Sequence, residues 1–483
     1  MKKVTTTLLL ATLLSACSKE PTQQTPLVEG ASTYVGFAIK YDNALLAGGH
    51  PVTRSADDDY NSIGTYEGRD LISTIDLYLS SPDGTFLQSQ RFEAETDLTY
   101  TYDAAGLQLI KAKSPIKTTP GNKIATVIIN SARPLMATQP DDDQTITVST
   151  SLPFTSIGAF VDNDGERILK TSFSGKSAET AIAEGVTVEG VQAGANIITL
   201  DVTRLISRVI VTKTADMEST TTLDGTFSDI SYAIGQCALT TYVFPQTDDT
   251  EYKSWGYDFV PDGNYLAEAT KYYHYDDLLT PIAVPNNLNT TADNMANLVN
   301  YEGKLLLENT HLAGSDASSS KYKKGNTTYI LVSTVFTPNP SMIKDGGALT
   351  DGTFYVGDTD GQLYSSIAAA QDVSTGSYNQ QVRTYTGGKV LYYVWLNPDN
   401  VAHTMNSPVV RNNIYQINIA GIHKLGVNWN PLNPSVNNPD PKPEGNEPPS
   451  PIVPTDPLSL DDTYMSVDIE VKNWTVHSYD VTL

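Results

Sequence analysis

The last twenty residues of the chain alternate between apolar and polar side chains. This period of two predicts a half-buried β-strand, because successive side chains of an extended backbone point to opposite faces. The alternation slips at residues 472–473, which predicts a bulge or a bend there and places Trp474 and Val476 on the opposite face. The apolar residues that share the first face are Met465, Val467, Ile469 and Val471.

A segment near the start of the chain has the same pattern. Residues 33–40 match residues 463–470 in phase, so the two strands could fill the same groove. Residues 430–457, which precede the C-terminal strand, are too rich in Pro for a helix or an inner strand and predict a tether. The apolar residues that match are Val35 with Met465, Phe37 with Val467 and Ile39 with Ile469.

Apolar runs predict further strands in both halves of the chain. Their long spacing favours an antiparallel β-sandwich over βαβ units. Asp83-Gly84 predicts a turn between two strands, and a polar stretch at residues 215–228 predicts a domain boundary near residue 217. The runs lie at residues 33–41, 72–80, 124–129, 145–151, 200–214, 327–336, 388–396 and 413–419.

Composition and charge exclude several classes of function. The 483 residues carry a net charge of −24, spread along the chain, so a nucleic-acid partner is not expected. The six histidines are scattered, and the chain has neither a nucleophile elbow nor a phosphate-binding loop. We therefore expect no enzymatic activity, no cofactor and no metal centre. The internal Cys237 is expected to be a small core residue.

Two acidic turns resemble fragments of a calcium-binding loop, at residues 162–166 and 358–361. Both lack the full ligand spacing and a distal Glu. Asp-rich stretches that end in Gly are more often hairpin turns, so we interpret both as turns.

The first seventeen residues have the pattern of an export signal. Lys2 and Lys3 precede a short apolar run at residues 8–14, and Leu-Ser-Ala-Cys follows at residues 14–17. This sequence resembles a bacterial lipobox, which would make Cys17 the lipidated first residue. The alternative is an ordinary signal peptide with a coincidental Cys.

A small, polar segment at residues 52–57 separates the first strand from the rest of the chain. It contains Arg54, which is a candidate for proteolytic cleavage before Ser55. Arg69 is the weaker alternative. Cleavage after Arg54 would remove residues 18–54, a propeptide that contains the first strand.

The second half of the chain resembles the C-terminal half of the Mfa-type fimbrillins, the major shaft subunits of type V pili (fimbriae) in Bacteroidetes. The resemblance is specific from about residue 304 onward and looser before it. Residues 465–479 at the C-terminal end are similar too. The segments that carry the resemblance most clearly are residues 322–332, 388–398, 406–415 and 425–431.

The resemblance implies an all-β fold with two transthyretin-like β-sandwich domains, at residues 55–217 and 218–457. It also implies export as an outer-membrane lipoprotein, cleavage by an Arg-specific protease and loss of the first strand. Residues 458–483 of a neighbouring subunit would then donate the replacement strand. The partners implied are identical subunits in a head-to-tail filament, minor anchor and tip subunits, and host or bacterial surface receptors.

The sequence thus predicts a structural subunit of a fimbrial shaft that supports adhesion and is polymerised by donor-strand exchange. The alternative from another class is a monomeric surface lipoprotein adhesin that binds host protein or glycan and keeps its first strand. A secreted hydrolase is a third and more distant hypothesis.

Overall fold

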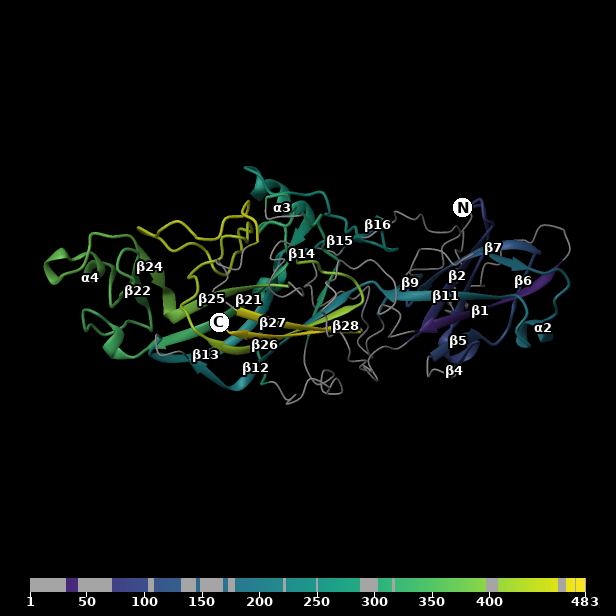
Figure 1. Ribbon diagram of the computed structural model, residues 1–483, viewed down its shortest axis with the longest axis horizontal. Helices are drawn as coiled ribbons and strands as arrows, with labels where there is room; N and C mark the ends of the chain where they lie inside the picture. The colour runs from purple at the N-terminus through teal and green to yellow at the C-terminus, as the bar shows by residue number, and fades with distance from the viewer. Residues whose placement is uncertain are drawn as a thin grey trace, which may run out of the picture.

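The structure is a computed structural model that describes residues 32–41, 72–102, 108–131, 145–147, 168–172, 179–219, 223–248, 251–286, 303–314, 318–396, 407–458, 466–473 and 475–482. Strands dominate these residues and form an elongated molecule (Figure 1), which confirms the all-β class. None of the helices in this part of the chain is long and apolar enough to cross a membrane. The helices are α1 (Ala94–Asp97), α2 (Val188–Gln192), α3 (Tyr265–Tyr272) and α4 (Ile367–Gln371), with 3-10 turns η3 (Asp276–Leu279), η5 (Pro340–Met342), η6 (Val373–Thr375) and η7 (Thr386–Gly388).

The N-terminal strands form one extended sheet in the order β3-β2-β7-β9-β11-β1-β5-β4. Two short strands lie off this path, where β10 pairs with β7 and β6 pairs with β1. The strands are β1 (Thr33–Tyr41), β2 (Thr74–Ser80), β3 (Phe86–Glu93), β4 (Leu98–Tyr102), β5 (Gln108–Ala112), β6 (Ile116–Thr118), β7 (Gly121–Ile129), β9 (Lys170–Ser172), β10 (Thr180–Ile182) and β11 (Ile197–Arg204).

The turn between β2 and β3 follows from its sequence. Gly84 has a φ of +85°, which favours a residue without a side chain. The Asp83 carboxylate accepts hydrogen bonds from the Ser81 hydroxyl at 2.7 Å and from the Thr85 amide at 2.9 Å. The turn predicted at Asp83-Gly84 is therefore confirmed.

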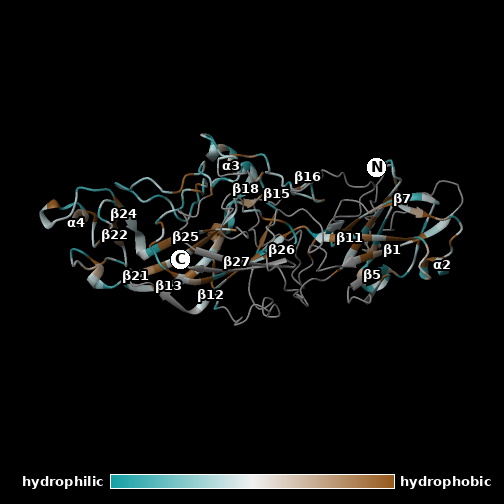
Figure 2. Ribbon diagram, in the orientation of Figure 1, coloured by the Kyte–Doolittle hydropathy of each residue, from teal (hydrophilic) through white to brown (hydrophobic). Residues whose placement is uncertain are grey.

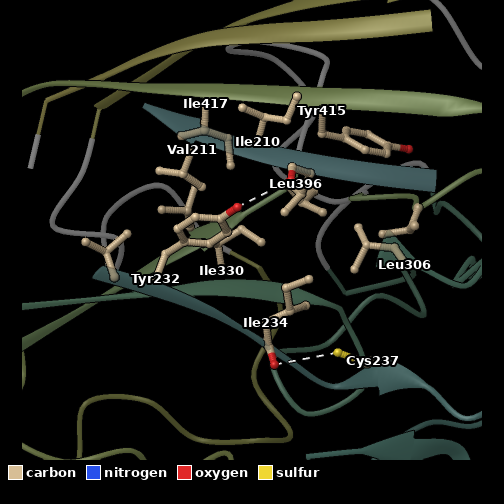
Figure 3. Packing of buried hydrophobic residues seen from close by; sticks show 14 of the residues in the cluster. Ile210, Val211, Tyr232, Ile234, Cys237, Leu306, Ile330, Leu396, Tyr415 and Ile417 are labelled. Carbon is tan, nitrogen blue, oxygen red and sulfur yellow. Dashed lines mark hydrogen bonds between the residues drawn. The ribbon is translucent and has the colours of Figure 1, made fainter. Parts of the chain in front are cut away.

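The C-terminal strands form two sheets that face each other across a common core. Figure 3 shows Val211 and Ile417 of one sheet packed toward Tyr232 and Ile330 of the other, with the buried Cys237 nearby. The first sheet consists of β20 (Lys304–Leu306), β12 (Ser207–Ser219), β26 (Asn413–Ile422), β28 (Thr475–Thr482) and β27 (Ser466–Asn473), and the second of β19 (Ile282–Ala283), β13 (Gly225–Gly235), β21 (Tyr329–Pro338) and β25 (Lys389–Trp395).

Pairing in these sheets is mostly antiparallel, but β1–β11, β12–β26 and β26–β28 are parallel. Small ladders complete the described strands. They are β8 (Thr145–Thr147) with β15 (Thr240–Tyr242), β14 (Cys237–Ala238) with β18 (Tyr273–His274), β16 (Thr247–Asp248) with β17 (Glu251–Tyr252), and β22 (Phe354–Gly357) with β23 (Leu363–Tyr364) and β24 (Val382–Tyr385).

The apolar run at residues 200–214 forms two strands rather than one. Leu205 and Ile206 separate β11 from β12, and both are buried in the core that the two halves share. The N-terminal sheet contains β11, whereas β12 pairs with β20 and β26 of the C-terminal sheet. The chain therefore passes from the N-terminal sheet to the C-terminal sheet before residue 217. The domain boundary was expected near residue 217.

The Pro-rich stretch at residues 430–457 is anchored to the C-terminal half and does not hang free. Leu432, Ile452 and Leu458 are buried in a core cluster with tyrosines of β21 and β25. The Asn430 side chain accepts a hydrogen bond from the Tyr393 hydroxyl at 2.6 Å. Apolar residues spaced along the stretch that was expected to be a tether therefore reach the core.

Figure 2 shows hydrophobic residues concentrated along the strands of both halves, with more hydrophilic residues in the connecting loops. This distribution matches the apolar core under the N-terminal sheet and the core between the C-terminal sheets.

Candidate functional site

The strand β1 occupies an inner position in the N-terminal sheet. On one side it runs parallel to β11, with Gly36 opposite Ile197 and Lys40 opposite Asp201. On the other side it runs antiparallel, first to β6 and then to β5. We refer to this place between β11 and the β5/β6 side as the β1 position. Its occupant makes backbone hydrogen bonds on both sides, so removing it exposes two sheet edges.

The apolar residues predicted on the first strand all point into the N-terminal core. Val35, Phe37 and Ile39 are each at most 2% exposed. Phe37 packs edge-on against Phe92 of β3, with ring centroids 5.0 Å apart. Burying each of these side chains contributes roughly 1.5–3 kcal/mol. The β1 position is therefore a row of apolar pockets that any replacement strand must fill.

Polar contacts fix the start of β1 and were not predicted from the sequence. The Thr33 hydroxyl donates to the carbonyl oxygen of Ala183 at 2.7 Å and accepts from the Val186 amide at 3.1 Å. The Asn196 side chain, on a residue with a φ of +50°, donates to the carbonyl oxygen of Tyr34 at 2.9 Å. The sequence around Thr33 and Asn196 has no pattern that indicates which distant residues they contact.

The other face of β1 lies under α2. A Cβ atom added at Gly36 would be 2.8 Å from a methyl group of Val191 and 2.9 Å from one of Ile197. Gly36 therefore allows β1 to approach α2 closely, and a larger residue at this position requires those methyl groups to move.

The C-terminal segment predicted to be donated forms a hairpin in this structure. β27 and β28 pair antiparallel, with Asn473 opposite Thr475, so the backbone reverses where the alternation slips. β28 then runs parallel to β26, and β27 lies at the edge of that sheet. The segment therefore pairs with its own chain. Among the described strands, β28 pairs with β26, and β27 pairs with β28.

The predicted site residues fall in three places. Val467, Ile469 and Val471 lie on β27 and Val476 on β28, in the C-terminal sheet. Val35, Phe37 and Ile39 lie on β1, and Figure 1 shows β1 and β27 in different parts of the elongated molecule. The residues outside the described ranges are Cys17, Arg54, Ser55, Arg69, Met465 and Trp474.

The acidic turn at residues 358–361 is held by protein groups. Asp360 accepts hydrogen bonds from the Tyr364 hydroxyl at 2.6 Å and from the Lys344 ammonium at 3.1 Å. The guanidinium of Arg383 donates to Asp358 at 2.7 Å. Across the described ranges, no cluster of three or more His, Cys, Asp or Glu side chains is placed to hold a metal ion. The turn at residues 162–166 lies outside those ranges.

An ion pair with a buried carboxylate occurs in each half. Asp76 of β2 lies 2.6 Å from the Arg91 guanidinium of β3. Burial raises the pKa of the Asp76 carboxyl, although Arg91 opposes that rise. In the C-terminal half, Arg411 and Glu308 form an ion pair at 3.0 Å with both side chains at most 1% exposed. Each charge compensates for the desolvation of its partner.

Contacts between residues far apart in sequence join the two halves. The Arg204 guanidinium donates to the Asn412 side-chain oxygen at 2.9 Å, and the Thr171 hydroxyl donates to the Val243 carbonyl oxygen at 3.0 Å. The ladder between β8 and β15 also crosses from one half to the other. The halves therefore share both polar contacts and a core.

Comparison with known proteins identifies relatives over the full length of the chain. Residues 383–480 match the family model described as major fimbrial subunit protein type IV, fimbrillin, C-terminal. Two sequences of the minor fimbrium subunit Mfa1 from Porphyromonas gingivalis are 29% and 30% identical over 516 aligned residues, covering 98% of this chain and 97% of each relative.

Solved structures of fimbrial proteins also align with this one. A fimbrilin (FimA) from Porphyromonas gingivalis W83 is 15% identical, with a TM-score of 0.40, 94% of this chain covered and 98% of the other. The tip fimbrial protein Mfa3 of the same species is 10% identical, with a TM-score of 0.35, 80% of this chain covered and 94% of the other. From the full-length sequence identity to Mfa1, this chain belongs to the fimbrillin family.

Proposed function

We propose that this chain is a shaft subunit of a fimbria and polymerises by strand exchange. Cleavage after Arg54 releases β1, and the segment that forms β27 in one subunit enters the β1 position of the next. Membership of the fimbrillin family makes the chain a fimbrial subunit, a structural and adhesion protein rather than an enzyme. The role in the shaft and the mechanism of assembly are the proposal.

The observation that carries the proposal is the position of β1. A strand near the N-terminus lies inside the sheet, and its three apolar side chains fill the N-terminal core. A segment near the C-terminus has the same alternation in the same phase. Val467 and Ile469 align with Phe37 and Ile39, so they would enter the same two pockets.

Loss of β1 makes insertion of a donated strand energetically favourable. The vacated position has unpaired backbone groups on two strands and uncovered apolar pockets, both costly in water. A donated strand restores the hydrogen bonds, and its alternate side chains fill the pockets. Because the donor and acceptor surfaces differ, the contact is head-to-tail and produces a filament.

The location of β27 suits donation to a neighbour. As an edge strand it is paired on one side only, so its release breaks one ladder. Leu458 is buried in the C-terminal core, and only residues 459–465 connect it to β27. A link of this length spans at most about 25 Å when extended. β1 and β27 lie in different parts of the molecule, which favours exchange between subunits (Figure 1).

Export and maturation complete the proposal. Cys17 is the lipidated first residue of an outer-membrane precursor, and an Arg-specific protease cuts between Arg54 and Ser55. The mature chain lies in cell-surface fimbriae with anchor and tip subunits, and the fimbria binds host or bacterial receptors.

A monomeric surface adhesin is the alternative. The hairpin of β27 and β28 on the chain's own β26 favours it, because a segment paired this way has no need of a neighbour. In that case β1 would remain in place in the mature protein.

One experiment separates the two. Purified precursor is treated with an Arg-specific protease and run on unboiled SDS gels, beside the Arg54→Ala variant. Strand exchange predicts a ladder of SDS-resistant oligomers from the cleaved wild-type chain and a single band from the variant. A single monomer band from both, with cleavage verified by mass, would favour the adhesin.

A further inference from the structure

A cavity beside β1 is left unfilled by the strand itself. It has a volume of about 320 Å³ and lies where β1 passes from β6 to β5. It is on the face of β1 that carries Gly36, opposite the face that packs in the N-terminal core. The lining residues used below are Gly36, Lys111, Lys113, Val191 and Ile197.

Two small residues of β1 lie on the cavity side of the strand. Gly36 and Ala38 are two positions apart and therefore share this face. The aligned residues of the C-terminal segment are Ser466 and Asp468, which are both larger. The donated strand therefore has a carboxylate at the point where the first strand has the methyl group of Ala38.

The sheet register assigns a partner to the acidic residue. Ala38 is directly opposite Lys111 of β5 in the antiparallel pair. A donated strand in the same register has Asp468 at that point, facing a lysine. Lys113 is already engaged, because its ammonium donates to the carbonyl oxygens of Thr96 at 2.8 Å and Glu95 at 3.3 Å. Lys111 is the cation placed for the carboxylate.

Building on the strand exchange proposed above, we propose that Asp468 of a neighbouring copy of the chain pairs with Lys111, which lines this cavity. The Ser466 side chain requires the methyl groups of Val191 and Ile197 to shift, and the cavity that these residues line gives them room. The propeptide strand has no group that can make this ion pair from position 38. The site therefore favours the donated strand over the strand it displaces.

The test uses two full-length chains that form one interface only. The donor carries Arg54→Ala, keeps its own β1 and can only donate. The acceptor is cleaved and carries Val467→Asp with Ile469→Asp, so it can only accept. The rate at which SDS-resistant heterodimer forms after mixing is measured for acceptors with and without Lys111→Glu.

We expect Lys111→Glu to slow heterodimer formation roughly tenfold, because an attractive cross-strand pair becomes repulsive. Asp468→Lys in the donor should restore the rate. The matched control is Lys117→Glu on β6, which is opposite Tyr34 and would be opposite Tyr464 of the donor. This variant should form heterodimer at the parental rate. Melting temperatures of all acceptors before mixing verify that they are folded.

The outcomes separate the two proposals. If the donor and the acceptor with Lys111 intact form no heterodimer, the proposal of strand exchange is wrong, and the proposed contact with Lys111 is wrong as well. If the parental pair dimerises but Lys111→Glu matches Lys117→Glu, or Asp468→Lys fails to restore the rate, only the site is wrong.

A second measurement does not need assembly. Ala38→Asp in the uncleaved precursor places a carboxylate opposite Lys111 on β1 itself. It should give a higher melting temperature than Ala38→Lys, and the difference should disappear when Lys111 is changed to Ala. Equal melting temperatures for the two Ala38 variants would overturn the proposed preference for an acid.

Discussion

The ring of Phe37 meets the ring of Phe92 edge-on, with 5.0 Å between centroids and an angle of 66° between planes. Phe37 belongs to the strand that cleavage would release, whereas Phe92 belongs to β3 and would stay. The pocket beside Phe92 thus accommodates a phenylalanine. The aligned donor residue, Val467, is smaller and leaves part of it empty.

Val467→Phe should therefore strengthen assembly. An edge-to-face aromatic pair contributes about 0.5–1.5 kcal/mol beyond burial, so dissociation of the donated strand should slow several-fold. Val467→Asp should prevent assembly, because a carboxylate would be buried in an apolar pocket. Oligomer lifetimes in SDS at increasing temperature give the measurement. Glu470→Ser, on the opposite face, is the control and should not weaken assembly. Weaker oligomers from Val467→Phe would show that the assumed register is wrong.

Arg54→Ala should leave β1 in place and give a folded precursor that does not polymerise. Three apolar side chains and hydrogen bonds to two neighbouring strands hold β1, so an uncut strand is not displaced. N-terminal sequencing of wild-type fibres should begin at Ser55. A start at Asp70 would move the cleavage to Arg69, and polymer that retains residues 33–41 covalently would contradict the scheme.

Cys17→Ala should reduce delivery of the precursor to the outer membrane, since the acyl anchor would be lost. Metabolic labelling with a radioactive fatty acid should label the wild-type precursor and not the variant. Normal surface fimbriae on cells that express only the variant would refute the lipoprotein assignment.

Arg411→Ala should destabilise the C-terminal half by about 3–5 kcal/mol, because Glu308 would be left buried without its partner. The Arg411 guanidinium also donates to the carbonyl oxygens of Tyr242 at 3.0 Å and Val243 at 3.3 Å. Denaturant unfolding of the precursor measures the change. The control is Lys271→Ala, which removes an exposed ion pair with Glu268 and should cost less than about 1 kcal/mol. A similar loss in both variants would contradict the prediction.

The strands were the most predictable part of the fold. The first strand was expected at residues 33–41 and is Thr33–Tyr41, because alternating apolar residues are a local signal. The phase slip at residues 472–473 was also visible in the sequence. A bulge and a reversal of the chain, however, interrupt the alternation of apolar and polar residues in the same way. Pairing of β27 with β28 distinguishes them.

Contacts between distant residues were not predictable. Asn430 lies in a Pro- and Asn-rich stretch that has no periodic pattern, yet it bonds to Tyr393 of β25 and lies 3.0 Å from the Tyr329 hydroxyl of β21. Its partners are fixed by the packing of the sheets and not by its neighbours in sequence. The cavity beside Gly36 was hidden for the same reason, because α2 and β5 meet there only in the folded chain.

The two-sided pairing of β1 also determines how a strand in its place responds to tension. A pull along the strand axis strains the hydrogen bonds to β11 and to β5 in shear, so many must break together. A hairpin such as β27–β28 can instead be peeled from its sheet edge one bond at a time. If the donated strand takes the β1 position, the joint between two subunits resists a pull along the strand axis more strongly than a pull that peels the strand from one end.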